Sequence, residues 1–509
     1  MCGIICVVSR PSARPLPLAA DILDALDRAI AAGTAGNIAE SGRLVAEADA
    51  SLRGESGLGT LIDNIALVTG LVSRVDQLDG LASGAEAQLE SESGLSTREV
   101  ERRSNELIAL RDATWSLRND RLRTAKAVGE LAGKDASASA RNAYLSIQQA
   151  FSALDRMEVR GRDSAGVHVL VWGHGLDATD KRVAPLLAGR LDDTLFTNGS
   201  VRVGAGSRAW SFVYKAAAEI GELGDNTRAM RTTVSNDALL RLLISQPNAR
   251  VSILGHTRWA SVGIISEPNA HPVNSEEVGG NSAAPYMLAA LNGDVDNHAD
   301  IKVRNGLHIA EPITTDAKVI PTVVARKNAA GMPFVDAFRE TVAEFEGSVA
   351  IAVASADEPN SMMLALRGSG QGLYVGIAED RFIVASEPYG VVEETLHYVR
   401  MDGESLADAN NPSSRGQVIA LDGDNAGSLA GMRMLAYDGT SIPLVDSTVS
   451  IAEVTTRDID RGEHKHFLSK EIAEAPLSFR KTLRGKISER NGQLEATLDT
   501  TVLPDDIRA

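Results

Sequence analysis

Cysteine is scarce in this chain. Its 509 residues include two cysteines, Cys2 and Cys6. Two thiols are too few for a disulfide framework or for a cysteine-rich zinc site. They also lie only four residues apart, which is awkward to bridge along one strand. If either residue has a function, we expect it to act as a free thiol.

Positive charge and long apolar segments are also scarce. The chain has 51 Lys and Arg residues against 68 Asp and Glu residues, a net charge of -17. Nucleic acids and anionic membranes bind basic surfaces, so we expect neither as a partner. No apolar run approaches the roughly 18–20 residues that span a bilayer, and the apolar start lacks the basic region of a signal peptide. We therefore expect a cytoplasmic protein.

The length of the chain favours two to four domains, at the usual size of roughly 100–200 residues each. The first eight residues predict a buried strand, because small and β-branched apolar residues follow one another without helical spacing. From about residue 142 onward, short strands alternate with turns rich in Gly, Asn and Asp. Many strands with few, clustered helices indicate a layered α+β fold.

The stretch 33–140 has a different composition, rich in Ala, Leu, Glu, Arg, Ser and Asp. Its apolar residues recur every three or four positions, which predicts amphipathic helices. After a break at 91–94, Ser96 and Glu99 have the spacing of a capping box. Two long helices around one break predict an antiparallel helical hairpin inserted into a loop. We find no catalytic constellation in it, so its plain interpretation is a structural or interaction element.

Cys2 becomes the N-terminal residue once Met1 is removed, and it then carries both a thiol and a free α-amine. A thiol with a pKa near ~8.5 is already a good nucleophile, and an α-amine with a pKa near ~8 can act as a general base at neutral pH. This pair needs no histidine. Gly3 would leave room for a substrate to approach the backbone. The alternative is that Cys2 is merely an early core residue.

Three downstream motifs fit the same chemistry, although each has a plainer interpretation. In "GHTRWASVG", Arg258 could grip a carboxylate or form a surface salt bridge. In "LNGDVDN", Asn292 and Gly293 could donate hydrogen bonds to an oxyanion or form an ordinary turn. In "TTDAKVI", Asp316 could bind an ammonium group or cap a helix. Together with Cys2, these residues could hydrolyse the side-chain amide of an amino acid.

A series of segments follows the order seen in class II glutamine amidotransferases, which this chain resembles. The segments are "CGII" at 2–5, "EVRGRDSAGV" at 158–167, "GHTRWASVG…PNAHPV" at 255–273, "LNGDVDN" at 291–297 and "TTDAKVI" at 314–320. Two later segments are similar to the glucosamine-6-phosphate synthase family: "LALRGSGQGLYVGIAEDRFIVASEP" at 364–388 and "HKHFLSKEIAEAP" at 464–476.

The resemblance implies the N-terminal-nucleophile hydrolase fold, a four-layer αββα sandwich, and hydrolysis of L-glutamine to glutamate and ammonia without a metal or cofactor. Cys2 would form a γ-glutamyl thioester, and Asn292 with Gly293 would form the oxyanion hole. The other implied residues form the substrate-binding site: Arg258 for the glutamine α-carboxylate, Asp316 for its α-ammonium, Trp259 and Ser261 in the loop that closes over glutamine, and Arg160 and Gly161 in the segment that packs beside the nucleophile.

The family also has a second half, a pair of sugar-isomerase domains that use the ammonia to convert fructose 6-phosphate to glucosamine 6-phosphate. We expect a glutamine amidotransferase domain at 1–32 and 141–455, the inserted helical hairpin at 33–140, and at 456–509 a linker to an isomerase domain that this chain does not contain. That domain would follow on the same polypeptide or belong to a separate subunit, or the chain would be a stand-alone glutaminase. We also expect a homo-oligomer.

The chain departs from the family pattern near the site. Leu291 stands where the family has histidine, Ser261 and Val262 replace threonine and histidine, and Lys318 replaces an acidic residue. None of these changes removes a core catalytic group of the family, but we expect the loop over glutamine to close differently. Two other hypotheses therefore stay open: a non-catalytic glutamine-sensing module that acts through the linker, and a scaffold that assembles through the helical insertion.

Overall fold

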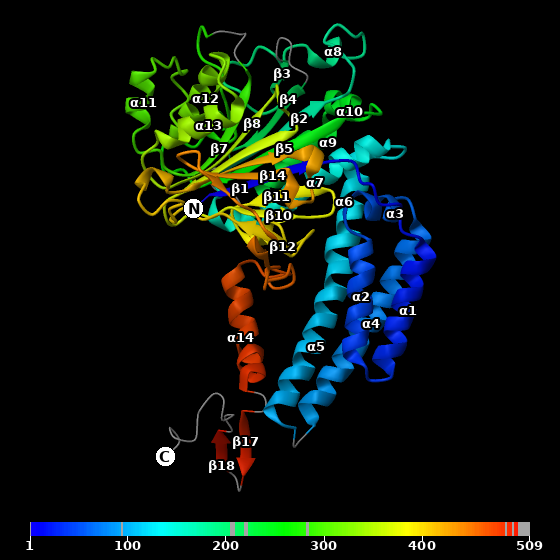
Figure 1. The fold of residues 1–509 in the computed structure, drawn as a ribbon. Coiled ribbons are helices and arrows are strands. Elements are labelled where there is room, and N and C mark those ends of the chain that lie inside the picture. The colour runs from blue at the N-terminus through cyan, green and yellow to red at the C-terminus, as the bar shows by residue number, and fades with distance from the viewer. Residues whose placement is uncertain are drawn as a thin grey trace. The chain divides into compact units, whose positions relative to one another are not determined.

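The structure, a computed structural model, describes residues 2–92, 95–203, 209–217, 222–280, 285–483, 486–490 and 493–496. The chain divides into two compact units, whose elements are labelled in Figure 1. The first unit comprises Met1–Pro15 and Thr124–Thr455, and the second comprises Leu16–Arg123 and Thr456–Ala509.

The first unit contains a nine-stranded sheet in which every neighbouring pair is antiparallel. In sheet order the strands are β16 (Val449–Ile451), β12 (His397–Arg400), β10 (Tyr374–Ile377), β11 (Arg381–Ala385), β1 (Gly3–Ser9), β5 (Arg250–Arg258), β2 (Ser164–Trp172), β4 (Ala209–Ala216) and β3 (Val201–Val203). The predicted first strand is thus central, and it is buried along its whole length.

A second, seven-stranded antiparallel sheet belongs to the same unit. Its strands are, in order, β15 (Ser441–Ile442), β14 (Met432–Ala436), β13 (Gln417–Asp422), β9 (Ser361–Arg367), β8 (Val349–Ser355), β7 (Met287–Gly293) and β6 (Val273–Asn274). β6 is short, so it covers only the first part of β7, where Val273 pairs with Ala289 and Asn274 with Leu288.

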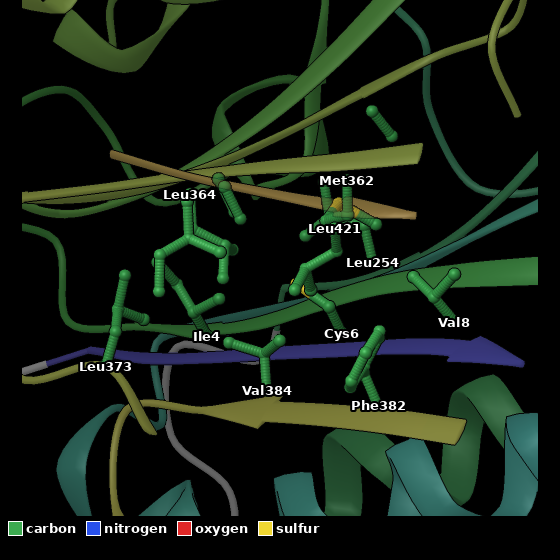
Figure 2. Close-up of a cluster of buried hydrophobic side chains, with 14 of the residues drawn as sticks. Ile4, Cys6, Val8, Leu254, Met362, Leu364, Leu373, Phe382, Val384 and Leu421 are labelled. Carbon is green, nitrogen blue, oxygen red and sulfur yellow. The ribbon is translucent and has the colours of Figure 1, made fainter. Parts of the chain in front are cut away.

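The two sheets share one hydrophobic core, to which alternate residues of β1 contribute. Figure 2 shows Ile4, Cys6 and Val8 of β1 packed in this cluster with residues of both sheets, among them Leu254 and Leu364. Because side chains of a strand alternate between its faces, the next residues of β1 point the other way. Cys6 is completely buried, and burial raises the pKa of its thiol far above the ordinary value. Cys6 is therefore a core residue.

Helices cover the outer faces of both sheets. α12 (Val319–Ala329) and α13 (Phe334–Ala343) pack on the second sheet with a core of their own, while α7 (Ala138–Met157) packs on β1 and β5 of the first sheet. The remaining helices of this unit are α6 (Arg123–Ala132), α8 (Ala184–Leu187), α9 (Asp225–Asn236), α10 (Ala238–Ile244) and α11 (His298–Arg304). The predicted mixture of α and β structure is confirmed.

The second unit is mainly helical and contains more helices than the expected hairpin, together with one antiparallel strand pair, β17 (Ile487–Arg490) and β18 (Gln493–Ala496). Its helices are α1 (Ala19–Thr34), α2 (Ile38–Ser51), α3 (Gly54–Leu61), α4 (Ile65–Ser91), α5 (Thr97–Trp115), the π-helical turn η1 (Ser116–Leu122) and α14 (Phe467–Leu483). α4 and α5 are the two long helices predicted around the break, and Ser96 accepts a hydrogen bond from the Glu99 N–H as expected of an N-cap. α1 and α2 pack with them as a four-helix arrangement.

The helical unit begins at Leu16 and its first segment ends at Arg123, both earlier in the chain than the predicted 33 and 140. The earlier start follows from α1, which we expected mainly in the amidotransferase domain and which packs against α2 and α4. Within the described residues, no single helix has the length and apolar composition of a membrane span. α3 and α4 reach these values only as a pair, and they meet at an angle of 102°.

Candidate active site

Cys2 lies at the start of β1, against the end of β5. The register of these two strands, in which Gly3 pairs with Thr257, brings the nucleophile candidate beside Trp259. The Trp259 N–H donates to the Cys2 sulfur over 3.2 Å, and the sulfur lies 3.4 Å from the Trp259 carbonyl oxygen. Burial raises the pKa of the Cys2 thiol, although the Trp259 N–H and the Arg258 charge oppose that effect. The thiol is therefore protonated at neutral pH and needs a base.

Two predicted glycines are explained by close packing around this strand end. A Cβ atom at Gly3 would lie 2.9 Å from the Thr257 hydroxyl oxygen and 3.0 Å from the Cβ of Met157. A Cβ atom at Gly161 would lie 2.6 Å from the carbonyl carbon of Arg258. The expectation that Gly3 leaves room for a substrate is thus wrong, because neighbouring side chains fill that space. Gly161 does pack beside the backbone that holds Cys2.

Asn292 and Gly293 end β7. Asn292 is 1% exposed, and its amide is held at both ends. The Asn292 Nδ2–H donates to the Ser386 hydroxyl over 2.7 Å, and the Asn292 Oδ1 lies 3.1 Å from Nε2 of His256. Gly293 has a φ of 88°, a left-handed conformation that favours glycine. The end of β7 is thus fixed by the side-chain hydrogen bonds of Asn292 and by the left-handed backbone of Gly293.

Two buried histidines hold the residue before this pair. His256 Nε2 donates to the Leu291 carbonyl over 2.9 Å, and His271 Nδ1 accepts from the Leu291 N–H over 3.4 Å. The imidazoles serve as hydrogen-bond partners at this point of β7 because β6 begins only at Val273, which pairs with Ala289, so the strand pairing stops short of Leu291. Burial lowers the pKa of His256 to about 3 and that of His271 well below the ordinary value, so both rings are neutral.

Arg258 lies at the end of β5 as predicted and is only 2% exposed. Its guanidinium donates to the carbonyl oxygens of Val262 and, over 3.1 Å, of Ile264. The plain alternative, a surface salt bridge, is therefore wrong. The guanidinium thereby fixes the loop that follows Trp259. Trp259 itself is 57% exposed.

Ser261 of this loop donates a hydrogen bond to Asp294 over 2.7 Å. Asp294 follows the Asn-Gly pair directly, and its charge contributes to the raised pKa values of both Cys2 and Asp316. In the sequence, Asp294 is distinguished only by its place next to Gly293.

Asp316 is buried and begins a short 3₁₀ turn, η4 (Asp316–Lys318). The Asp316 carboxylate accepts from the Val295 N–H over 2.8 Å, two residues beyond the Asn-Gly pair. Burial raises the pKa of Asp316, while the Val295 N–H opposes that change. The alternative role as an N-cap is not observed, since Thr315 occupies the N-cap position.

Lys318, which stands where the family has an acidic residue, binds Asn274 of β6. Its buried amine donates to the backbone and side-chain oxygens of Asn274 over 2.6 and 2.8 Å. Burial lowers its pKa to about 7. Arg160 forms an ion pair with Glu387, so the structure gives Arg160 a partner within the protein. Among the described residues, no group of His, Cys, Asp and Glu side chains could hold a metal ion.

The strand ends thus gather a thiol, a buried guanidinium, two carboxylates and an amide with its following N–H. These groups can supply a nucleophile, a carboxylate grip, an ammonium grip and oxyanion donors. The residues that sequence reasoning missed are Ser386, His256, His271 and Asp294. The two histidines stand within the recognised motifs, but nothing local distinguished them from ordinary core residues.

No protein-family model matches the chain. Over 262 residues it is 26% identical to the glutamine–fructose-6-phosphate aminotransferase (isomerizing) of Bacillus cereus, a match that covers 52% of this chain and 38% of that protein. It is 28% identical over 272 residues to the enzyme of the same name from Geobacillus kaustophilus, covering 53% and 40%. The match thus spans about two-fifths of the length of these curated relatives.

Among solved structures, the chain is similar to glutamine phosphoribosylpyrophosphate amidotransferase from B. subtilis, at 17% identity and a TM-score of 0.35. That likeness covers 57% of this chain and 47% of the other. At such a TM-score it supports no conclusion about either fold or function.

Proposed function

We propose that this chain is a glutamine amidotransferase of the N-terminal-nucleophile class, which hydrolyses L-glutamine to glutamate and ammonia. The observation that carries the proposal is the position of Cys2 just before the central strand β1, beside Arg258 and Trp259, while the Ser386 hydroxyl joins β1 to Asn292 at the end of β7. The similarity to glutamine–fructose-6-phosphate aminotransferases supports it independently.

In the proposed reaction, removal of Met1 frees the α-amine of Cys2. That amine takes the proton of the thiol, because burial keeps the thiol protonated. The sulfur then attacks the glutamine amide carbon, and the developing oxyanion is stabilised by the Asn292 side-chain N–H and the Gly293 backbone N–H. The amine returns the proton to the leaving nitrogen, so ammonia departs and a γ-glutamyl thioester remains. Water, activated by the same amine, hydrolyses the thioester to glutamate.

The proposed substrate grip uses the two buried charges. Arg258 would bind the α-carboxylate of glutamine, because its guanidinium has five N–H donors and the loop carbonyls take only some of them. Asp316 would bind the α-ammonium. Trp259 and Ser261 would belong to the loop that closes over the substrate, and Ser261 would exchange its bond to Asp294 as the loop moves.

Arg160 and Gly161 would act beside the nucleophile rather than on the substrate. Gly161 packs on the Arg258 backbone, and Arg160 is paired with Glu387. In this role they would keep the end of β5 in the position that Cys2 requires.

The acceptor belongs to the proposal as well. The named relatives are isomerizing aminotransferases of fructose 6-phosphate, so we propose that ammonia passes to fructose 6-phosphate on a sugar-isomerase domain and yields glucosamine 6-phosphate. That domain would lie on the same polypeptide beyond residue 509 or on a separate subunit. A four-layer αββα sandwich, a cytoplasmic location and a homo-oligomeric state complete the proposal.

Comparison of Cys2→Ala with Cys6→Ala tests the proposed chemistry. Glutamate release from glutamine would be measured for both variants, together with the intact mass of each chain. We expect Cys2→Ala to abolish hydrolysis, and Cys6→Ala to keep it at the cost of some stability, since Cys6 lies in the core. Unchanged hydrolysis in Cys2→Ala would refute the proposal.

A further inference from the structure

The Ser386 hydroxyl connects the nucleophile strand with the oxyanion candidate. Ser386 directly follows β11 and is 1% exposed. Its Oγ accepts a hydrogen bond from the Ile4 N–H over 2.8 Å and a second one from the Asn292 Nδ2–H over 2.7 Å. A serine oxygen has two lone pairs, so both are used. The Ser386 N–H also donates to the Ile4 carbonyl over 3.1 Å.

These bonds set the relative position of two segments that are far apart in the sequence. Ile4 is the second residue of β1 and lies two residues after Cys2, so the position of its backbone governs where the thiol lies. Asn292 ends β7 of the other sheet. One oxygen atom therefore joins the strand that presents the nucleophile to the amide that would receive the oxyanion.

The same oxygen determines how the Asn292 amide is oriented. One Nδ2–H is committed to Ser386, and Oδ1 faces Nε2 of His256 at 3.1 Å. Since His256 is neutral and its Nε2 also donates to the Leu291 carbonyl, that nitrogen carries the proton. A flipped amide would set its Nδ2–H against the Nε2–H of His256, so His256 fixes the orientation, and one Nδ2–H remains to donate elsewhere.

We infer that Ser386 is a positioning residue for the reaction: it holds Asn292 and β1 so that the free Nδ2–H and the Cys2 sulfur meet the same substrate carbonyl. This inference rests on the proposed function and goes beyond it, because the proposed reaction assigns Ser386 neither a bond to glutamine nor a proton transfer. Oxyanion donors are effective only when they are fixed before charge develops. Loss of the Ser386 hydroxyl should therefore lower kcat and leave the KM for glutamine unchanged.

The test compares Ser386→Ala with Ser252→Ala. Ser252 lies on β5, paired with Val8 of β1, and is equally buried, but its hydroxyl has no hydrogen-bond partner among the described residues. Each variant thus removes one buried hydroxyl, at Ser252 from β5 and at Ser386 from the residue that follows β11. We expect Ser386→Ala to lower kcat about 10- to 100-fold at constant KM, in keeping with the effect of small displacements in active sites. Ser252→Ala should be within about twofold of the wild type, and Ser386→Thr, which keeps the oxygen, should recover most of the rate.

A second measurement separates positioning from general damage. In the γ-aldehyde analogue of glutamine, an aldehyde replaces the side-chain amide. The Cys2 thiol would add to the aldehyde carbon, and the tetrahedral adduct would place its oxygen where the oxyanion forms in the proposed reaction. Glutamate makes no such adduct. Ser386→Ala should weaken aldehyde binding about as much as it lowers kcat, while glutamate binding stays unchanged. If Ser386→Ala does not accumulate as folded protein, Ser386→Cys has nearly the same size with a weaker acceptor, and the same result is expected of it.

Two results would count against the inference in different ways. An active wild-type chain whose Ser386 variants keep kcat and aldehyde affinity, or change only KM, would overturn the role of Ser386 alone. A wild-type chain that neither hydrolyses glutamine nor binds the aldehyde would overturn the proposed function and this inference with it.

Discussion

Gly293→Ala should be among the most damaging single-methyl changes in the first unit. A Cβ atom at this position would lie 1.9 Å from the Ser348 carbonyl oxygen, just before β8. The two backbones would have to separate by more than ~1 Å, which costs about 1–3 kcal/mol as overpacking. The φ of 88° adds about 1–2 kcal/mol for a non-glycine residue. We therefore expect Gly293→Ala to lower the free energy of unfolding by about 2–5 kcal/mol.

The same displacement would move the proposed oxyanion donors. A shift of about 1 Å in a catalytic group can cost ~100-fold in rate, so kcat for glutamine hydrolysis should fall by about that factor even where the protein stays folded. Urea unfolding would report the stability, and glutamate release at saturating glutamine would report kcat.

Gly331 supplies the matched control. Its φ is 97°, but no atom lies within 4 Å of the position that a Cβ would take. Gly331→Ala should therefore show the backbone penalty of about 1–2 kcal/mol without the clash and without loss of kcat. If Gly293→Ala behaved like Gly331→Ala in both measurements, the close approach of Ser348 to the proposed oxyanion hole would be refuted.

Three further predictions concern charge and stability. The free energy of unfolding should fall as the pH drops below ~6.5, because His256 then binds a proton in the unfolded chain but not in the folded one, where burial lowers its pKa to about 3. The slope is about 1.4 kcal/mol per pH unit for one such histidine. Chemical unfolding at pH 5 and 7 should show a shallower slope for His256→Gln than for the wild type. In the helical unit, Asp49→Ala should lower the free energy of unfolding by about 3–5 kcal/mol, because buried Asp49 pairs with buried Arg121 and also with Arg53. A loss below ~1 kcal/mol, measured by thermal unfolding, would contradict this prediction. Lys215→Met should raise the melting temperature at pH 7, because the Lys215 amine is buried without a hydrogen-bond partner in the described part of the chain and burial lowers its pKa to about 7. The gain should shrink towards pH 10, because the buried amine of the folded wild type is then neutral and no longer costs the free energy of burying a charge.

Local pattern was sufficient to predict some elements. The apolar run after Cys2 forms the buried β1, and the capping spacing of Ser96 and Glu99 marks the start of α5. Arg258 and the Asn292–Gly293 pair do lie at strand ends. Such features depend on neighbours in the sequence, so periodicity and turn chemistry reveal them.

Features that depend on distant segments were not predictable in this way. Ser386 acquires its importance from Ile4 and Asn292, which lie far from it in the chain. Similarly, α1 belongs to the helical unit because it packs against α2 and α4. A serine, a histidine or an amphipathic helix carries no sign of its partner in its own sequence.

The central claim is that Cys2, freed of Met1, is the nucleophile of a glutamine-specific site. The most direct test is to treat the chain with a diazoketone analogue of glutamine and to map the label by peptide mass spectrometry, with and without excess glutamine. The account predicts one label per chain, on the sulfur of an N-terminal Cys2 in peptides that lack Met1, with protection by glutamine. A label on Cys6, a label that glutamine does not prevent, or labelled peptides that retain Met1 would contradict it.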